Sequence, residues 1–199
     1  MNQSTFLRYF PKCAAILLFA SAPAYPQIFS FGAIGGVQLT DSYTNVGVPN
    51  GGSSHSNDRY VIGPTVEFHF PFHLSLEGDA LYRRSGFSIN GFNVGFANVT
   101  VDDWQFPILL KYEFPYGPAR PFFDAGLVFR QVSSSAAFPL NPLNASSHGF
   151  AIGGGVAIKL GRTRLSPQIR FSHWNNAAFG NEAVTSTSDQ ADLLVGFTF

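Results

Sequence analysis

Residues 102–114 read DDWQFPILLKYEF, and apolar and polar side chains alternate through most of this stretch. One phase, formed by every second residue of 104–114, is entirely aromatic or aliphatic. The other phase carries the charged residues Asp103, Lys111 and Glu113. Successive side chains of a β-strand point to opposite faces, so the stretch predicts a strand with one apolar face and one charged face.

The same period of two recurs along the chain after the first two dozen residues. Connections between the periodic segments alternate between short turns and long polar stretches, and no stretch has helical periodicity worth assigning. This pattern predicts an all-β fold, an eight-stranded antiparallel up-and-down transmembrane β-barrel with four long loops at one end. The eight predicted strands are 29–39, 59–70, 73–84, 102–114, 121–132, 150–160, 164–174 and 190–199.

The N-terminal segment 1–24 has the features of an export signal. It begins with basic residues and no acid, continues with the short apolar run AAILLFA, and ends with small residues at Ala22 and Ala24. The apolar run is too short to span a membrane as a helix, which needs about 20 residues. We therefore expect a signal peptide over 1–24 and a barrel domain over 25–199.

Composition supports an all-β chain and excludes several partners. The 199 residues include 22 Phe and 20 Gly, and only 12% are charged. The single cysteine, Cys13, lies within the predicted signal, so we expect no disulfide in the mature chain. Without a basic patch, nucleic acid is not an expected partner, and no residue spacing indicates a metal or cofactor site.

Alternation alone does not say which face of the strands points inward, because a soluble barrel such as a lipocalin also alternates. Aromatic residues gather near the predicted strand ends, as in membrane-interface girdles, and glycines are frequent in the opposite phase. The polar phase holds seven acids and, with Arg59, seven bases, which suits a closed interior. We therefore predict apolar residues outward and an interior charge network of Glu67, Glu77, Asp79, Arg83, Asp103, Lys111, Glu113, Asp124, Arg130, Lys159, Arg164, Arg170 and Asp192.

The chain ends in ADLLVGFTF, with Val195, Phe197 and Phe199 in one phase. In architecture and in this terminal strand it resembles the small eight-stranded outer-membrane β-barrel family that includes the barrel domain of the outer membrane protein A type. The resemblance implies an outer-membrane location among outer-membrane lipid, and recognition of these three residues by the barrel assembly machinery. It also implies a non-enzymatic role in envelope integrity or surface interaction, with a possible ligand at the long loops. We expect a monomer without a porin-sized pore, because eight strands enclose only side chains.

A second, weaker resemblance concerns the stretch RFSHWNNAAFGNEA at 170–183. It looks like the lipid A 3-O-deacylase family, in which a His, a Ser two residues later and a downstream Glu act together. The resemblance implies that His173 would be the general base, with Asn176 as the motif's Asn and Glu182 as the acid. Asn175 stands where the family has its nucleophilic Ser, so the alternative is an altered or inactive hydrolase.

A structural role for the same stretch is the favoured interpretation. Ser172 adjoins His173 but is expected to point to the other face, where it could not replace the missing nucleophile. His173 and Trp174 can instead form an interfacial pair, with Trp174 at the lipid headgroup level. The sequence therefore predicts a protein without enzymatic activity.

Overall fold

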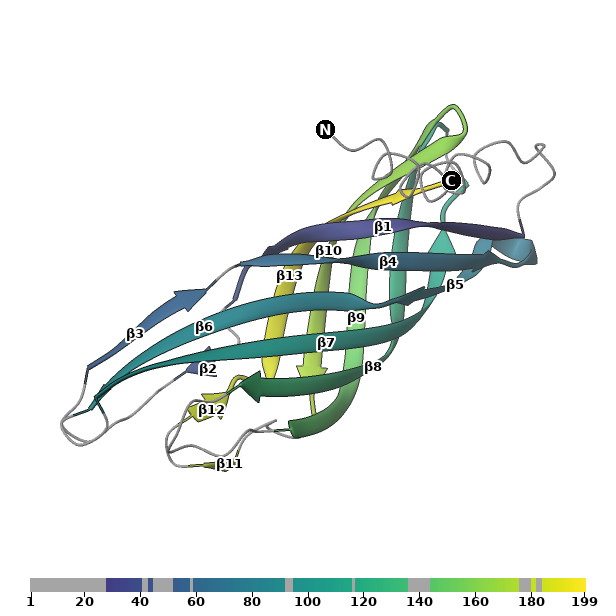
Figure 1. Cartoon of the computed structure of the whole chain (residues 1–199). Helices are drawn as coiled ribbons and strands as arrows, with labels where there is room; N and C mark the ends of the chain where they lie inside the picture. Colours follow the sequence, from purple (N-terminus) through teal and green to yellow (C-terminus); the bar gives the residue numbers. More distant parts are fainter. Residues whose placement is uncertain are drawn as a thin grey trace, which may run out of the picture.

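The computed structural model describes most of the chain (Figure 1). The predicted signal peptide, 1–24, lies outside the described residues. No helix in the part that is described is long and apolar enough to cross a membrane. The described residues are 28–40, 43–44, 52–57, 59–91, 95–115, 117–135, 144–175, 180–181 and 184–199.

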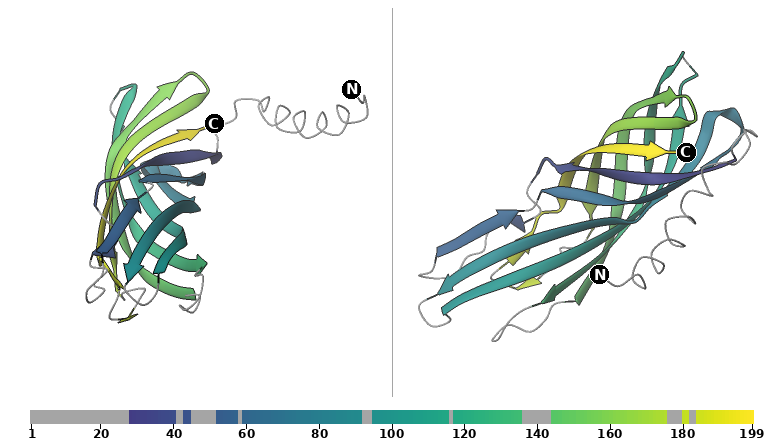
Figure 2. Two further views of the ribbon diagram at one scale, coloured as in Figure 1. Left: turned by 60° about the vertical axis from the view of Figure 1, so that its left-hand side comes forward. Right: turned by 45° about the horizontal axis from the view of Figure 1, so that its top comes forward.

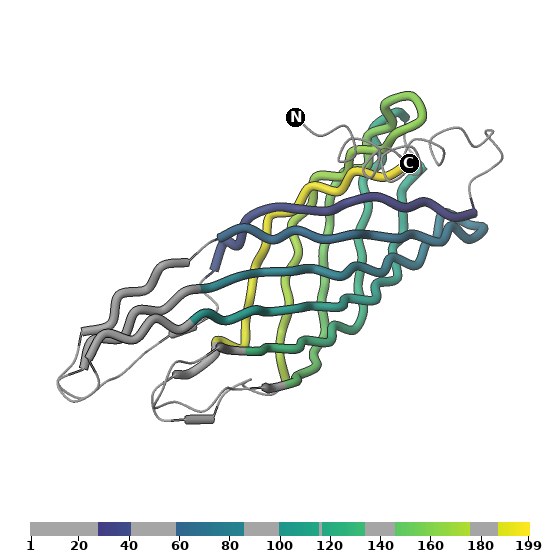
Figure 3. Tube along the Cα trace, viewed as in Figure 1, coloured from purple at the N-terminus to yellow at the C-terminus, as the bar shows by residue number. Residues whose placement is uncertain are grey.

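Antiparallel strands close into a barrel, which confirms the predicted fold class (Figures 1 and 3). The first strand, β1, pairs with β13 on one side and with β4 on the other, so the wall has no free edge there. Every predicted strand is present. The elements are β1 Phe29–Gln38, β2 Tyr43–Thr44, β3 Gly52–Asn57, β4 Tyr60–His69, η3 Pro71–His73, β5 Leu74–Asp79, β6 Leu81–Gly91, β7 Gly95–Glu113, β8 Ala119–Ser135, β9 Asn144–Leu160, β10 Thr163–Trp174, β11 Gly180–Asn181, β12 Val184–Ser186 and β13 Asp189–Thr198.

The apolar phase of the strands faces outward. On β7, Leu110 is 53% exposed, whereas its neighbour Lys111 is 3% exposed. At about 3.3 Å per residue and a tilt of about 40°, the outward apolar residues from Trp104 to Phe114 span roughly 25 Å along the membrane normal. Such a band matches the hydrocarbon thickness that outer-membrane barrels cover.

The predicted third strand, 73–84, is divided into β5 and β6 at Ala80. Its partner β4 carries Pro64 at this point, and Pro has no backbone N–H to donate to the ladder. The register is unchanged across the break, since Thr65 pairs with Asp79 and Ile62 with Tyr82. The two segments therefore act as one stave of the barrel wall.

Short turns join the strands at one end of the barrel, which we call the turn end. One of them is η3, in which Phe72 has φ 67° and His73 has φ 62°. The β9–β10 turn contains Gly161 at φ 68°, a left-handed conformation that glycine adopts without strain. The C-terminus lies at this end as well (Figure 2).

At the opposite end, the loop end, strands continue well beyond the predicted boundaries. The predicted loop 86–100 is largely a hairpin, because β6 and β7 stay paired as far as Gly91 and Gly95. β3 adds to β6, and β8 and β9 remain paired to Ser133 and Asn144. β2, β11 and β12 form a separate small sheet. The barrel thus carries a strand extension that projects from its loop end (Figures 1 and 2).

Candidate functional site: the barrel interior and the outer rim

The lumen is filled by charged side chains from the inward phase of the strands. Lys159 differs from the prediction: it lies one residue before the end of β9 and its side chain is exposed, because the barrel opens to solvent there. Arg164, at the start of β10, is partly exposed. The other predicted interior residues are buried: Glu67, Glu77, Asp79, Arg83, Asp103, Lys111, Glu113, Asp124, Arg130, Arg170 and Asp192.

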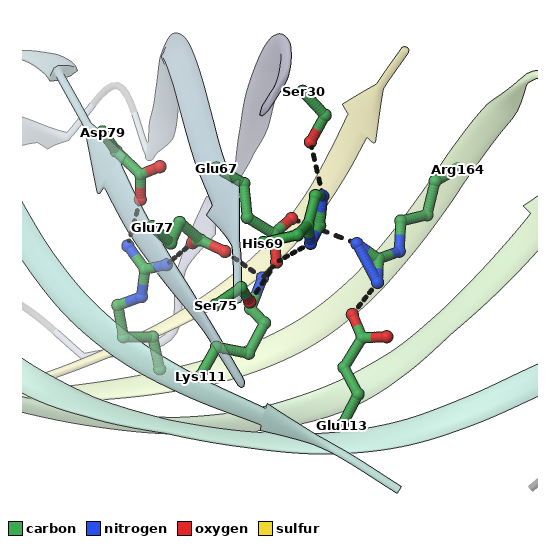
Figure 4. A network of polar contacts seen from close by, with 10 residues as sticks. Ser30, Glu67, His69, Ser75, Glu77, Asp79, Lys111, Glu113 and Arg164 are labelled. Carbon is green, nitrogen blue, oxygen red and sulfur yellow. Dashed lines mark hydrogen bonds and ion pairs between the residues drawn. The ribbon is translucent and has the colours of Figure 1, made fainter. Parts of the chain in front are cut away.

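The half of the lumen nearer the turn end contains a set of ion pairs, the turn-end network, built from Glu67, Glu77, Asp79, Lys111, Glu113, Arg164 and Arg170 (Figure 4). Arg170 bridges the barrel from β10 to β5, with 2.7 Å from NH2 to Glu77 Oε1 and 2.7 Å from NH1 to Asp79 Oδ2. Lys111 on β7 contacts Glu77 as well. The Arg170 pairs connect β10 to a strand on the far side of the barrel and brace the lumen, whereas the Lys111–Glu77 pair joins the adjacent strands β7 and β5.

Glu67 and Glu113 extend the turn-end network to the barrel mouth. Glu67 accepts a hydrogen bond from Ser75 Oγ at 2.6 Å and one from Arg164 NH1 at 3.1 Å. Arg164 also pairs with Glu113. His69 lies 3.9 Å from Glu67 and its Nε2 is 3.1 Å from Ser30 Oγ (Figure 4).

A second set, the loop-end network, comprises Arg83, Asp103, Gln105, Arg130, Gln190 and Asp192. Arg83 NH2 lies 2.7 Å from Asp192 Oδ2, across the barrel from β6 to β13. Arg130 NH2 lies 2.7 Å from Asp103 Oδ2. Gln105 and Gln190 link the two ion pairs by hydrogen bonds.

Apolar side chains lie between the two networks. Leu81 stands between Asp79 and Arg83 on the same stave and clusters with Ile34, Val61 and Leu194. A second cluster consists of Leu109, Val128, Ala151 and Trp174. Packed apolar groups and cross-barrel ion pairs therefore both occupy the lumen of the described barrel.

The prediction that Trp174 anchors the barrel in the lipid headgroups is wrong. Trp174 is 3% exposed and points inward, where the Arg130 guanidinium lies 5.2 Å from the ring centroid. β10 places Arg170, Ser172 and Trp174 on its inward phase, because side chains alternate strictly along a strand. His173 consequently faces outward.

The residues that the hydrolase resemblance implies are only partly placed. Asn176 and Glu182 lie outside the described residues. His173 Nδ1 is 2.7 Å from Asp189 Oδ1, and the two residues are register partners on β10 and β13. Sequence reasoning missed Asp189. This residue could have been found by pairing the last two predicted strands in antiparallel register.

Neither Asn175 nor Ser172 supplies a nucleophile to this outward site. Asn175 is exposed and its backbone N–H donates to the His148 carbonyl at 3.0 Å, but an amide side chain is not a nucleophile. Ser172 is buried on the inward side of the wall, as expected. Among the residues described, no group of three or more His, Cys, Asp or Glu side chains could hold a metal ion.

The three residues of the predicted assembly signal lie together on the lipid-facing side of β13. Val195, Phe197 and Phe199 are all exposed. The Phe197 and Phe199 rings meet edge to face at 5.0 Å, and Phe199 also lies 6.2 Å from Phe31 on β1. The terminal strand therefore presents a continuous aromatic surface at the seam where the barrel closes.

Comparisons with known proteins agree with this architecture. A family model described as outer membrane protein beta-barrel domain matches residues 13–192. The chain is similar to the structure of outer membrane protein OprG from Pseudomonas aeruginosa, with a TM-score of 0.57 and 15% identity over 85% of this chain and 92% of that one. It is also similar to Neisserial surface protein A, with a TM-score of 0.53 and 13% identity over 85% and 95% of the two chains. No curated protein matches the sequence.

Proposed function

Because the chain belongs to the family of outer membrane protein beta-barrel domains, we propose that it is a sealed, non-enzymatic barrel whose strand extension interacts with partners at the cell surface. The outward apolar side chains contact outer-membrane lipid. The barrel assembly machinery recognises Val195, Phe197 and Phe199 during insertion. The protein acts as a monomer, since the β1–β13 and β1–β4 pairings close the wall within one chain.

The observation that carries this proposal is the projection of β3, β6 and β7 from the loop end. Asp102 and Trp104 mark the upper edge of the apolar band, and β7 continues from there to Gly95. Seven residues of strand correspond to roughly 23 Å. A paired hairpin of this length holds its backbone in one arrangement, which lowers the entropic cost of binding a partner compared with a mobile loop.

The filled lumen argues against transport. Arg170 and Arg83 each reach a carboxylate on a distant stave, so their guanidinium groups occupy the axis of the barrel. Moving them aside would leave buried carboxylates without partners, which costs several kcal/mol. In planar lipid bilayers we expect no stepwise conductance from the purified protein, and steady channel openings would contradict the sealed interior.

A shortened hairpin tests the surface role. In this variant the two residues Asn-Gly replace 86–100 and form a tight turn between Ser85 and Val101. Ser85 and Val101 are register partners, so the two strands stay in register. We expect it to fold, as shown by heat-modifiable gel migration, and to restore the detergent resistance of a deletion strain as well as the wild type does. Adhesion or autoaggregation of the same cells should be lost. Equal adhesion with both barrels would overturn the surface role and leave envelope integrity as the function.

A second candidate function is favoured by the contact between His173 and Asp189. A carboxylate bonded to Nδ1 orients an imidazole so that Nε2 can act as a general base. A surface groove of about 290 Å³ lies nearby, lined by Phe106, Phe129 and His148 among others. Such a site would act on an ester of an outer-leaflet lipid, with water in place of the missing Ser.

Mass spectrometry of lipid A distinguishes the two functions. If the site around His173 and Asp189 is a hydrolase, lipid A from cells expressing the wild-type chain will lack one acyl chain, and His173→Ala will abolish this loss. If the barrel is non-enzymatic, lipid A will have the same acyl pattern in cells with the wild type, in cells with His173→Ala and in cells without the protein.

A further inference from the structure

The turn-end half of the lumen holds one more carboxylate than it has cations to pair with. Its cations are Lys111, Arg164 and Arg170, together with Arg120, whose NH1 lies 3.9 Å from Glu113. Facing these four cations are five buried carboxylates: Glu67, Glu77, Asp79, Glu113 and Asp124. The surplus is one negative charge, and all five carboxylates are buried from water.

Asp124 on β8 is the carboxylate without a partner. It is 1% exposed, and neither Oδ1 nor Oδ2 has a hydrogen-bond partner. Every other buried carboxylate in the lumen has at least one ion pair. Lys111 is the register partner of Asp124 on β7, but its amine is directed to Glu77 and Glu67.

No hydrogen-bond donor in the described structure reaches the Asp124 carboxylate. Its register partner on β9 is Gly153, where even a Cβ would come within 2.6 Å of Oδ1. Gly153 therefore brings no side chain to the carboxylate. A hydrogen on the Asp124 carboxyl group removes its negative charge, so that the group no longer needs a cation or donors for both of its oxygens.

An ionised, unpaired carboxylate in this position would cost several kcal/mol. We propose that Asp124 is a proton-binding site of the barrel interior, whose carboxyl group carries a hydrogen ion at neutral pH. The bound proton makes the turn-end half of the lumen electrically neutral, with four ionised carboxylates facing four cations. The charged groups that act on Asp124 are Lys111 on β7, Arg170 on β10, Glu77 on β5 and Glu67 on β4.

Losing this proton would disturb the brace across the lumen. An ionised Asp124 competes with Glu77 for Lys111, because Lys111 lies directly beside it on the neighbouring strand. The unfolded chain ionises Asp124 in water at neutral pH, whereas the folded barrel keeps it protonated. Stability supplied by this site is therefore full only at acidic pH, where the unfolded chain also protonates Asp124. It declines as the pH rises and the unfolded chain ionises, and it is gone once the folded barrel releases the proton.

Infrared spectroscopy tests the proposal on the wild-type chain itself. The mature protein is folded into lipid bilayers with its aspartates labelled by carbon-13, and the spectrum is recorded from neutral to alkaline pH. We expect an isotope-shifted carbonyl band of a protonated aspartic acid at neutral pH that disappears on alkalinisation. Absence of this band in the folded wild-type barrel at neutral pH would overturn the proposal without any variant.

Variants assign the band. Asp124→Asn should remove the band and leave the thermal midpoint of the barrel unchanged or raised, because an amide resembles the protonated acid. Asp192→Asn is the matched control, since Asp192 is equally buried but bonded to Arg83. It should keep the band and lower the midpoint. If Asp124→Asn lowered the thermal midpoint as much as the control does, Asp124 would be ionised instead. The same conclusion would follow if the midpoint of the wild type fell when sodium and magnesium are removed.

Discussion

The turn-end and loop-end networks fill the same lumen with the same residue types, yet their charges are balanced differently. In the loop-end network Asp103 and Asp192 face Arg130 and Arg83, which makes it neutral. The turn-end network, together with Asp124 and Arg120 in the same half of the lumen, has five carboxylates and four cations. The two lie on either side of apolar side chains such as Leu81. Neutrality in a barrel interior is therefore a local condition, because charges separated by packed apolar groups do not replace one another as partners.

The sharpest way to break this comparison is to remove a cation from the network that already has a surplus of acid. Arg170→Ala leaves Glu77 with Lys111 alone and Asp79 without its ion pair. We expect a loss of about 3–5 kcal/mol in the free energy of unfolding, the range for breaking a buried pair. Urea titration of the barrel in detergent, followed by heat-modifiable gel migration, measures it.

Arg170→Ala combined with Asp124→Asn tests the protonation of Asp124 in the weakened barrel. If Asp124 carries a proton, its replacement by Asn leaves the charge of the lumen unchanged, and we expect the double variant to be as destabilised as Arg170→Ala. Recovery of stability in the double variant would show that Asp124 is ionised. A loss below about 1 kcal/mol for Arg170→Ala would contradict the bracing role of this side chain.

The corresponding change in the neutral network should cost less. Arg83→Ala removes the ion pair with Asp192, but Asp192 keeps a hydrogen bond from Gln190 Nε2 at 2.8 Å. We expect a loss of about 2–3 kcal/mol, the upper part of the range for a hydrogen bond to a charged group. The same urea titration gives the value. If Arg83→Ala proved as costly as Arg170→Ala, the difference between the two networks would have no energetic meaning.

Much of this arrangement could be predicted from the sequence, because a strand in a closed wall has only two faces. A shift of one residue would put Lys111 into lipid and Leu110 into the lumen, so the alternation leaves no freedom in assigning sides. The same rule placed Asp124 and Asp192 inward. Alternation along β10 also places Trp174 inward. The expectation of an aromatic girdle places it outward, and that expectation is wrong.

Two other features were beyond the sequence. Which cation meets which acid across the lumen depends on the stagger of the strands around the barrel, and alternation carries no information about stagger. This is why an overall count that included Arg59 and Lys159 suggested balance, although both side chains are exposed. The sequence pattern predicts a loop where the strand extension lies. Strands with water on both faces need no apolar phase, so alternation does not reveal them.

The inward position of Trp174 can be tested by fluorescence. The chain has only two tryptophans, so Trp104→Phe and Trp174→Phe each leave a single one. We expect lipids with brominated acyl chains to quench Trp104, which faces outward, and to leave Trp174 unquenched. Trp174→Phe should cost about 1 kcal/mol, because Phe keeps a ring over Arg130 but binds a cation less strongly. Equal quenching of the two residues would contradict the inward assignment.

The smallest effect is expected outside the lumen, at an ion pair that resembles the interior ones only in its residue types. Arg84 Nε lies 4.0 Å from Asp102 Oδ1 on the outer rim, and the Arg84 side chain is 54% exposed. Water screens this pair, and Asp102 keeps a hydrogen bond from the Tyr82 hydroxyl at 2.6 Å. We therefore expect Arg84→Ala to change the free energy of unfolding by about 0.5 kcal/mol or less. A loss as large as that of Arg83→Ala, its neighbour on the inward phase, would mean that the side of the wall does not determine the strength of an ion pair in this barrel.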